Sequence, residues 1–320
     1  MTIYDVFNGD ADGICSLVQL RRHQPEASEL ITGVKRDIQL LSTINPQQGD
    51  VVNVLDVPME KNKAALEAML ANGVKVFYCD HHASGDIPDH ANLTSLVNLD
   101  ANVCTSLLIN GHLQGQFALW AVVGAFGDNL KASAKAVAKP LQLSSQQLDQ
   151  LGRLGISITY NGYGAALEDL HFTPKALYQE LVKYSSPFEF MSDNKAVFEQ
   201  LENGYKNDMG NVAALEPHFK SEHAAVYVLP NEKWARRVSG VYSNDLANNF
   251  ADRAHAVLTE KADGAYLVSV RAPLNNKQGA VDICSQFPSG GGRAAAAGIN
   301  DLPAEQVAQF IETFQSFYKS

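Results

Sequence analysis

The stretch IYDVFNGDADGICSL, residues 3–17, places two aspartates and two glycines directly after a short apolar run. The run IYDVF (3–7) predicts a buried strand, and the residues from about 13 to 23 predict the helix that follows it. Glycine, asparagine and aspartate are common in turns, so the loop needs no ligand to explain Asp10 and Asp12. The alternative is that the two carboxylates hold a cation, and the stretch alone leaves both interpretations open.

The length and composition are those of a globular protein. The chain has 320 residues, of which 46% are hydrophobic and 19% charged, and it is long enough for two domains of ordinary size. No apolar run approaches the roughly 20 residues of a membrane-spanning helix, and the N-terminus lacks the basic segment and apolar stretch of a secretory signal. The four cysteines include no C-x-x-C pair, which argues against a disulfide framework or a zinc ribbon. We therefore expect a cytoplasmic protein with no membrane partner.

The net charge of −10 restricts the class of ligand. Proteins that coat long nucleic acids usually carry a basic excess, because neutralising phosphates drives their affinity. An acidic chain can still bind phosphate where metal ions and a local arginine patch supply the positive charge. The charge therefore favours a compact site for a small anionic ligand.

Strands and helices alternate over the first 130 residues, which predicts a parallel sheet with helices on both faces. Apolar runs predict the strands, at 3–7, 51–55, 74–79 and 95–99. Helical patterns fit between them, at about 13–23, 60–72 and 103–111.

The rest of the chain divides into a helical stretch and a second unit rich in strands. The pattern is mostly helical from about 116 to 220, and strands begin again at AAVYVL (224–229). Two further strands flank an Asp-Gly turn at Asp263 and Gly264. We predict an α/β protein with three parts: a parallel-sheet domain at 1–186, a helical connector at 187–221 and a smaller α/β domain at 222–320.

Carboxylate and imidazole side chains gather where the predicted strands end. They occur after the first strand, in NVLDVP (53–58), in CDHH (79–82) and, after an apolar helix, in GAFGDNL (124–130). Each aspartate alone is more often a helix cap or a turn residue. In open α/β sheets, however, ligands bind at the carboxyl ends of the strands. Oxygen ligands with imidazole suit Mn²⁺ or a similar divalent ion, and two such ions about 3.5–4 Å apart form a clamp for attack on phosphorus.

These ordered motifs resemble those of a known family. NGDADG (8–13), LDVP (55–58), CDHH and GAFGDN are similar to the four motifs of the DHH phosphoesterase superfamily. This superfamily includes RecJ-type exonucleases, the oligoribonucleases called nanoRNases, cyclic-dinucleotide phosphodiesterases and certain pyrophosphatases. SVRAP (269–273), VDIC (281–284) and FPSGGGRAAAAGI (287–299) resemble the DHH-associated domain, with a strand, a helix, and a glycine-rich loop that opens a helix.

The resemblance implies a site and a reaction. It implies two Mn²⁺ ions, with Mg²⁺ or Co²⁺ as substitutes, and a bridging role for Asp56. The implied metal ligands are Asp10, Asp12, Asp56, His81 and Asp128. The triplet Asp80, His81 and His82 would be catalytic, with Asp80 and His82 orienting His81 and contacting phosphate. Metal-activated hydroxide would then attack a phosphodiester.

The chain departs from the family pattern at two positions. Many members place a histidine or another aspartate just before the first paired carboxylate, whereas here the nearest polar group is Asn8. Asn8 could still ligate through its neutral carbonyl oxygen, but the lower negative charge would weaken the first metal site. The glycine loop commonly ends in histidine, and here it gives Arg293.

The second unit offers candidates for binding phosphate. Gly290, Gly291 and Gly292 would let backbone amides approach an anion, at the positive end of an alanine-rich helix expected to follow them. Alternatively, these three glycines only form a tight connection between a strand and a helix. Arg293 and Arg271 could add charged contacts. Arg236 and Arg237 either touch nucleotide or form a solvated face.

We expect a Mn²⁺-dependent phosphodiesterase that removes nucleotides from short oligonucleotides, in the manner of a nanoRNase. The alternatives are a single-stranded DNA exonuclease, a cyclic-dinucleotide phosphodiesterase and a 3′-phosphoadenosine-5′-phosphate phosphatase. A catalytically weakened nucleic-acid-binding scaffold is the alternative of another class. The expected partners are short single-stranded RNA or DNA, or a small nucleotide. Strands of the second unit could also pair between two subunits as a homodimer.

Overall fold

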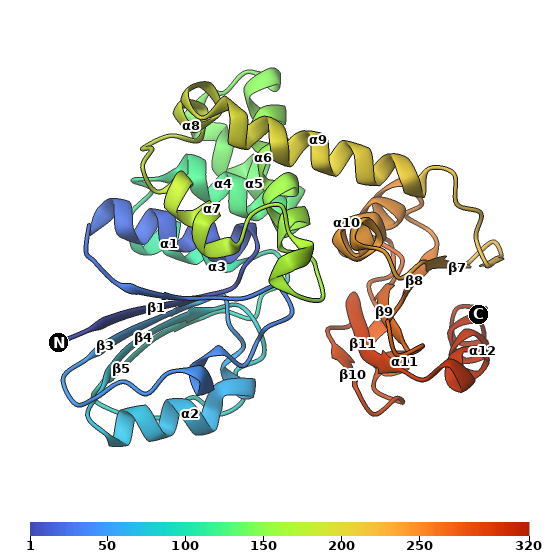
Figure 1. The fold of residues 1–320 in the computed structure, drawn as a ribbon, viewed down its shortest axis with the longest axis horizontal. Helices are drawn as coiled ribbons and strands as arrows, with labels where there is room; N and C mark the ends of the chain where they lie inside the picture. Colours follow the sequence, from blue (N-terminus) through green and yellow to red (C-terminus); the bar gives the residue numbers. More distant parts are fainter. Residues whose placement is uncertain (320) are drawn as a thin grey trace. The chain divides into compact units, whose positions relative to one another are not determined.

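The chain forms two compact units, each with its own sheet (Figure 1). A computed structural model describes residues 1–319, and the first unit ends at Gly204 while the second begins at Tyr205. The boundary lies inside one long helix, α9 (Lys195–Val212). The predicted fold class is confirmed: a parallel-sheet α/β domain, a helical region, and a smaller α/β domain.

The sheet of the first unit has five parallel strands in the order β2-β1-β3-β4-β5. Each predicted apolar run forms a strand within two residues of its predicted bounds. The three-residue strand β2 was not predicted, because its short sequence ELI gives no alternation to detect. The strands are β1 (Ile3–Phe7), β2 (Glu29–Ile31), β3 (Val51–Leu55), β4 (Lys75–Asp80) and β5 (Leu93–Val97).

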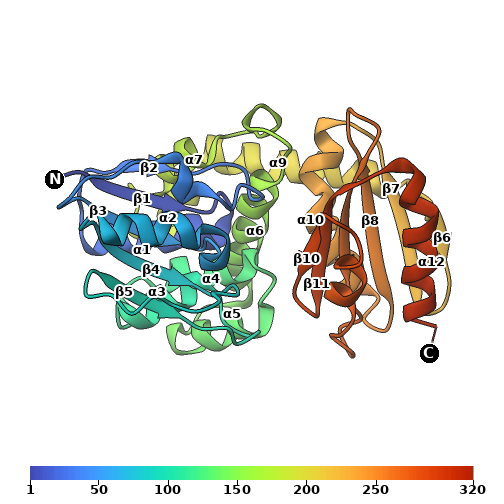
Figure 2. The same cartoon turned by 90° about the horizontal axis from the view of Figure 1, so that it is seen from below.

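Helices cover both faces of this sheet (Figures 1 and 2). One face packs against α1 (Ala11–His23) and α3 (Thr105–His112), and the other against α2 (Met59–Ala71). Helix α4 (Ala118–Gly127) packs against α1 and α3. Successive strand residues point to opposite faces, so neighbours enter different cores. Phe7 belongs to the core on the side of α1, whereas Val6 belongs to the core on the side of α2.

Side chains cap the start of three of the four remaining helices of the first unit. Ser144 and Gln147 form a capping box at the start of α6, and Thr173 caps α7 just before Pro174. These helices are α5 (Lys131–Ala138), α6 (Ser145–Gly162), α7 (Pro174–Leu181) and α8 (Pro187–Asp193), with single 3₁₀ turns at 40–43, 139–141 and 167–169.

A buried ion pair lies inside this unit. Asp5 in the middle of β1 is fully buried and accepts hydrogen bonds from Nε and Nη2 of Arg21, at 2.7 and 2.6 Å. Ser28 Oγ and Asn53 Nδ2 donate to the same carboxylate, at 2.6 and 2.8 Å. The carboxylate is therefore fully paired, as a buried charge must be. It ties β1 to α1 and to β3.

The second unit contains a six-stranded sheet in the order β10-β11-β9-β8-β7-β6. Strands β7 and β8 are parallel and the other pairs are antiparallel. The strands are β6 (Phe219–Lys220), β7 (Ala224–Leu229), β8 (Ala254–Glu260), β9 (Tyr266–Arg271), β10 (Gly290–Gly292) and β11 (Ala296–Leu302).

Three helices, a 3₁₀ turn and the C-terminal part of α9 complete the second unit. Apolar side chains of α11 (Ala280–Cys284) and α12 (Val307–Phe317) form its core with the sheet, and α10 (Lys233–Asn249) packs against β7, β8 and β9. The 3₁₀ turn lies at 304–306. Among residues 1–319, none of the helices combines the length and the apolar character that crossing a bilayer requires.

The alanine-rich segment after the glycines does not form a helix, and that prediction was wrong. Residues 290–292 and 296–302 form the hairpin β10–β11, and β11 pairs with β9. A Cβ on Gly298 would lie 2.6 Å from the carbonyl oxygen of Val268, so glycine is needed for this close approach. Sheet pairing therefore overrides the helix propensity of alanine.

His255 makes the stability of the second unit depend on pH. Its side chain is fully buried in β8, and burial, with the charge of Arg253, lowers its pKa to about 4. The unfolded chain therefore binds a proton between about pH 6.5 and 4 that the folded chain does not bind.

We expect the free energy of unfolding of the wild type to fall by about 2 kcal/mol between pH 7 and pH 5 because of this group. Urea denaturation at the two pH values measures it, against His255→Met, which should lack this part of the fall, and against the exposed control His223→Met. An equal fall in wild type and His255→Met would contradict the assignment.

Candidate functional site

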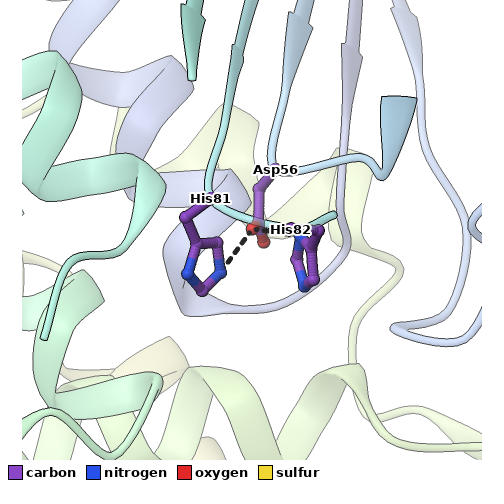
Figure 3. Close-up of side chains that lie close together, drawn as sticks. All are labelled: Asp56, His81 and His82. Carbon is purple, nitrogen blue, oxygen red and sulfur yellow. Dashed lines mark ion pairs between the residues drawn. The ribbon is translucent and has the colours of Figure 1, made fainter. Parts of the chain in front are cut away.

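The predicted site residues of the first unit come together at the carboxyl edge of the parallel sheet. Asp56 directly follows β3, and His81 and His82 directly follow β4, so the three side chains meet (Figure 3). One ligand atom from each of the three lies within 4.8 Å of the other two.

Three carboxylates surround one ring nitrogen. His81 Nε2 lies 3.4 Å from Asp56 Oδ1, 3.8 Å from Asp12 Oδ2 and 3.9 Å from Asp128 Oδ2. The structure thus brings four of the predicted metal ligands into one cluster, from the ends of β3, β4 and α4 and the start of α1. Asp128 caps the C-terminus of α4, which ends at Gly127.

A backbone carbonyl fixes the orientation of the His81 ring. Its Nδ1 lies 2.9 Å from the carbonyl oxygen of Val103, and a carbonyl can only accept, so Nδ1 carries a proton. Nε2 is then the atom that faces the carboxylates. A metal-ligating histidine is typically oriented in this way by a bond from its other nitrogen.

Asp12 is held by the start of a helix. Its two oxygens accept hydrogen bonds from the backbone N–H groups of Thr105 and Ser106, at 2.8 and 2.7 Å, in the first turn of α3. Burial would raise the pKa of Asp12, but the charge of His81 and the bonds from Ser106 keep it below its ordinary value. Asp12 is therefore ionised although its side chain is buried.

Asp56 is the strained member of the cluster. Its backbone φ is +61°, a left-handed conformation that is unusual for a residue with a side chain. Thr105 Oγ1 donates to Asp56 Oδ1 at 3.2 Å. Burial raises the pKa of Asp56 well above its ordinary value, and the charges of Asp12 and Asp10 act in the same direction.

The cluster carries more negative charge than its own groups can balance. Burial would lower the pKa of His81, but the hydrogen bond with Asp56 and the charges of Asp128, Asp56 and Asp12 raise it to about 10. At neutral pH the His81 ring would therefore carry a second proton, on Nε2. Oxygen donors, one free imidazole nitrogen and surplus negative charge fit a divalent metal ion, whose binding would release that proton.

Asp80 contacts a different histidine from the one expected. Its Oδ1 lies 2.8 Å from His82 Nδ1, so Asp80 orients His82 and not His81. The two imidazole rings are 4.4 Å apart, and the His82 side chain is 31% exposed whereas that of His81 is 1% exposed. His82 Nδ1 also lies 3.8 Å from Asp56 Oδ1, so the ring of His82 borders the cluster while part of its side chain is exposed.

Asp10 takes part in two structural contacts. Its Oδ1 accepts hydrogen bonds from the N–H groups of Asp12 and Gly13, at 2.9 and 3.2 Å, and thereby caps α1. Its Oδ2 forms an ion pair with Lys35. Asn8 Oδ1 accepts from the N–H of Asp10 at 3.2 Å, and Asn8 Nδ2 donates to the carbonyl of Lys35 at 3.1 Å.

Sequence reasoning missed Lys35. The only signal was that TGVKRD (32–37) follows β2, whose carboxyl end lies at the same sheet edge as those of β1 and β3. Burial would lower the pKa of Lys35, but the charge of Asp10, with Tyr163, Asp128 and Asp56, raises it. Lys35 therefore remains a cation in this site.

Backbone segments touch around Asp10. A Cβ on Gly9 would lie 2.1 Å from the Gly33 carbonyl oxygen, and one on Gly162 would lie 2.7 Å from the Gly9 carbonyl oxygen. The N–H of Lys35 donates to the Gly162 carbonyl at 2.8 Å. The loop that carries Asp10 is thus clamped between the segment at 33–35 and the end of α6.

The predicted phosphate-binding residues lie in the second unit and make contacts there. Arg271 Nε donates to Asn244 Oδ1 at 2.7 Å, and Arg236 Nη1 donates to Asn231 Oδ1 at 2.6 Å. The guanidinium of Arg237 forms an ion pair with Asp208 at 2.7 Å, so its charge has a partner in the protein. The other predicted members belong to the β10–β11 hairpin and its turn: Gly290, Gly291, Gly292 and Arg293.

Comparison with protein families assigns both parts of the chain. Residues 1–139 match the DHH family, N-terminal domain, and residues 221–320 match the DHHA1 domain. The chain belongs to the DHH phosphoesterase superfamily. The recognition from NGDADG, LDVP, CDHH and GAFGDN is thereby confirmed. A comparison with curated protein sequences found no match.

Solved structures share the fold at low sequence identity. RecJ of Thermus thermophilus, solved in complex with Mn²⁺, is 17% identical with a TM-score of 0.58; the match covers 99% of this chain and 52% of RecJ. The pGpG-specific phosphodiesterase PggH of Vibrio cholerae is 15% identical with a TM-score of 0.54, over 98% of both chains. CDC45 of Entamoeba histolytica is 8% identical with a TM-score of 0.58, over 100% of this chain and 95% of CDC45. This DHH-family chain therefore spans about half the length of RecJ.

The clamp around Asp10 predicts that Gly162→Ala is destabilising. Its Cβ would collide with the Gly9 carbonyl oxygen, which is backbone and cannot rotate away. We expect a loss of about 1–3 kcal/mol in the free energy of unfolding, measured by urea denaturation. The matched control is Gly210→Ala in α9, where a Cβ meets nothing within 4 Å and alanine should stabilise by about 0.5–1 kcal/mol. Equal stability of the two variants would show that the segments do not touch.

Proposed function

We propose that this chain is a metal-dependent phosphodiesterase that hydrolyses short oligonucleotides. One observation carries the proposal: the carboxylates of Asp12, Asp56 and Asp128 converge on His81 Nε2, and the Val103 carbonyl holds the other nitrogen of that ring. A stable fold has no need of three carboxylates around one buried imidazole. A binding scaffold has no chemical use for them either.

Each residue of the cluster has a part in the reaction. Asp12, Asp56, His81 and Asp128 would hold a divalent cation, for which the mixture of oxygen and nitrogen donors favours Mn²⁺. A bound divalent ion lowers the pKa of a coordinated water and stabilises charge that develops on phosphoryl oxygens. The N–H groups of α3 keep Asp12 ionised and fixed in position.

His82 is the residue that we propose faces the substrate. Because Asp80 accepts the proton of Nδ1, the outer nitrogen Nε2 is the one available to a bound nucleotide. In the protonated ring, Nε2–H would donate a hydrogen bond to a phosphate oxygen or a proton to the leaving oxygen. The bond to Asp80 would hold the orientation of the ring.

Two properties support a short substrate. The net charge of −10 disfavours a long polyanion bound along the surface. PggH, which is described as specific for pGpG, shares the fold over 98% of both chains, so this fold can serve a dinucleotide. RecJ shares the fold with 99% of this chain, which makes a single-stranded DNA exonuclease the second candidate.

The metal centre predicts different outcomes for two neighbouring residues. His81→Ala and Asp56→Ala should lose Mn²⁺ binding and at least about a thousandfold in kcat/KM, because each removes a ligand. His82→Ala should bind Mn²⁺ as the wild type does and lose about 10²–10⁴-fold in kcat. Calorimetric Mn²⁺ titration and steady-state hydrolysis measure the two effects, with exposed Asp86→Ala as the control. Wild-type activity in His81→Ala or Asp56→Ala would refute the metal site, and lost metal affinity in His82→Ala would make His82 a ligand.

A substrate panel tests the length preference. With Mn²⁺, we expect kcat/KM for pGpG and a diribonucleotide to exceed that for a 20-nucleotide RNA or single-stranded DNA by at least about tenfold, about 1.4 kcal/mol in transition-state binding. A cyclic dinucleotide and 3′-phosphoadenosine-5′-phosphate complete the panel. A preference for the long DNA would favour the exonuclease instead.

A further inference from the structure

The Asp10 side of the site already contains a cation. One oxygen of the Asp10 carboxylate caps α1, and the other forms an ion pair with the ammonium of Lys35. Asn8 is the neutral residue where many family members have a ligand. Its side-chain oxygen accepts a hydrogen bond from the N–H of Asp10, and its side-chain nitrogen donates one to the carbonyl of Lys35. A metal ion on this side would have to displace the ammonium from Asp10.

Contacts hold Lys35 at its two backbone groups and at its ammonium. Its N–H is bound to the Gly162 carbonyl at 2.8 Å, and its C=O accepts from Asn8 at 3.1 Å. Its ammonium lies 5.6 Å from the centre of the Tyr163 ring, a cation–π distance, and its side chain is only 24% exposed. An ordinary surface lysine is mobile, whereas this one is fixed at both backbone groups and at its charged end.

We propose that Lys35 supplies the positive charge on the Asp10 side of the site, in place of a second divalent ion. This inference rests on the proposed function. The chain then holds one tightly bound metal ion, on Asp12, Asp56, His81 and Asp128, whereas the family resemblance implies two. An ammonium has three donors, so Lys35 can bind Asp10 and a phosphate oxygen of the substrate at the same time.

Metal stoichiometry tests this inference without measuring activity. Equilibrium dialysis against Mn²⁺ in the absence of nucleotide, followed by mass spectrometry of bound metal, should give one tight ion per wild-type chain. Lys35→Met should bind a second ion at least about tenfold more tightly than the wild type does, about 1.4 kcal/mol. The control Lys183→Met removes an exposed lysine paired with Glu180 and should titrate as the wild type.

Substrate binding gives a second measurement. At a Mn²⁺ concentration that fills the tight site but not the second site of Lys35→Met, this variant should raise KM for the dinucleotide at least about tenfold, and Lys35→Arg should restore most of it. Two tight ions in the wild type, or a Lys35→Met titration equal to that of the wild type, would overturn the inference. Asp56→Ala separates this failure from that of the proposed function: if it keeps the tight ion, the metal site itself is wrong, whatever Lys35 does.

Discussion

The buried carboxylate of Asp12 is the group on which the rest of the site depends. Its oxygens accept one backbone N–H each from Thr105 and Ser106, residues 93 and 94 positions away in the sequence, and so join the start of α1 to the start of α3. These bonds keep the carboxylate ionised inside the protein, and its charge helps to keep His81 protonated when no metal is bound. A polar contact between two helix N-termini thus sets both the geometry and the charge of the site.

The sheet and the ligand cluster could be predicted because their causes are visible in the sequence. Apolar runs mark the strands, and parallel strands must end at one edge, so Asp56 and His81 had to meet. The Val103 carbonyl behind His81 and the Lys35 ammonium beside Asp10 could not be predicted, because each depends on how a loop folds back. The sequence after Gly292 predicts a helix because alanine favours helices locally, whereas its pairing with β9 is a long-range effect.

The first unit contains two buried carboxylate sites that differ in how their negative charge is balanced. Asp5 is surrounded by Arg21, Ser28 and Asn53, which satisfy it without any ligand, and it serves to join strands and helix. The cluster around His81 crowds three carboxylates together, and their charge raises the pKa of His81. The charges of Asp128 and Asp56 also act on the Lys35 ammonium. A fully paired network is inert, whereas an unbalanced one is a place where a ligand can bind strongly.

The left-handed backbone at Asp56 has an evolutionary consequence. Glycine or asparagine would adopt a φ of +61° with less strain, so this position is a trade-off between folding stability and function. Random substitution there would often yield a chain that folds at least as well and has lost its central carboxylate. The carboxylate of Asp56 thus comes to the site from a backbone conformation that folding stability alone would give to glycine or asparagine.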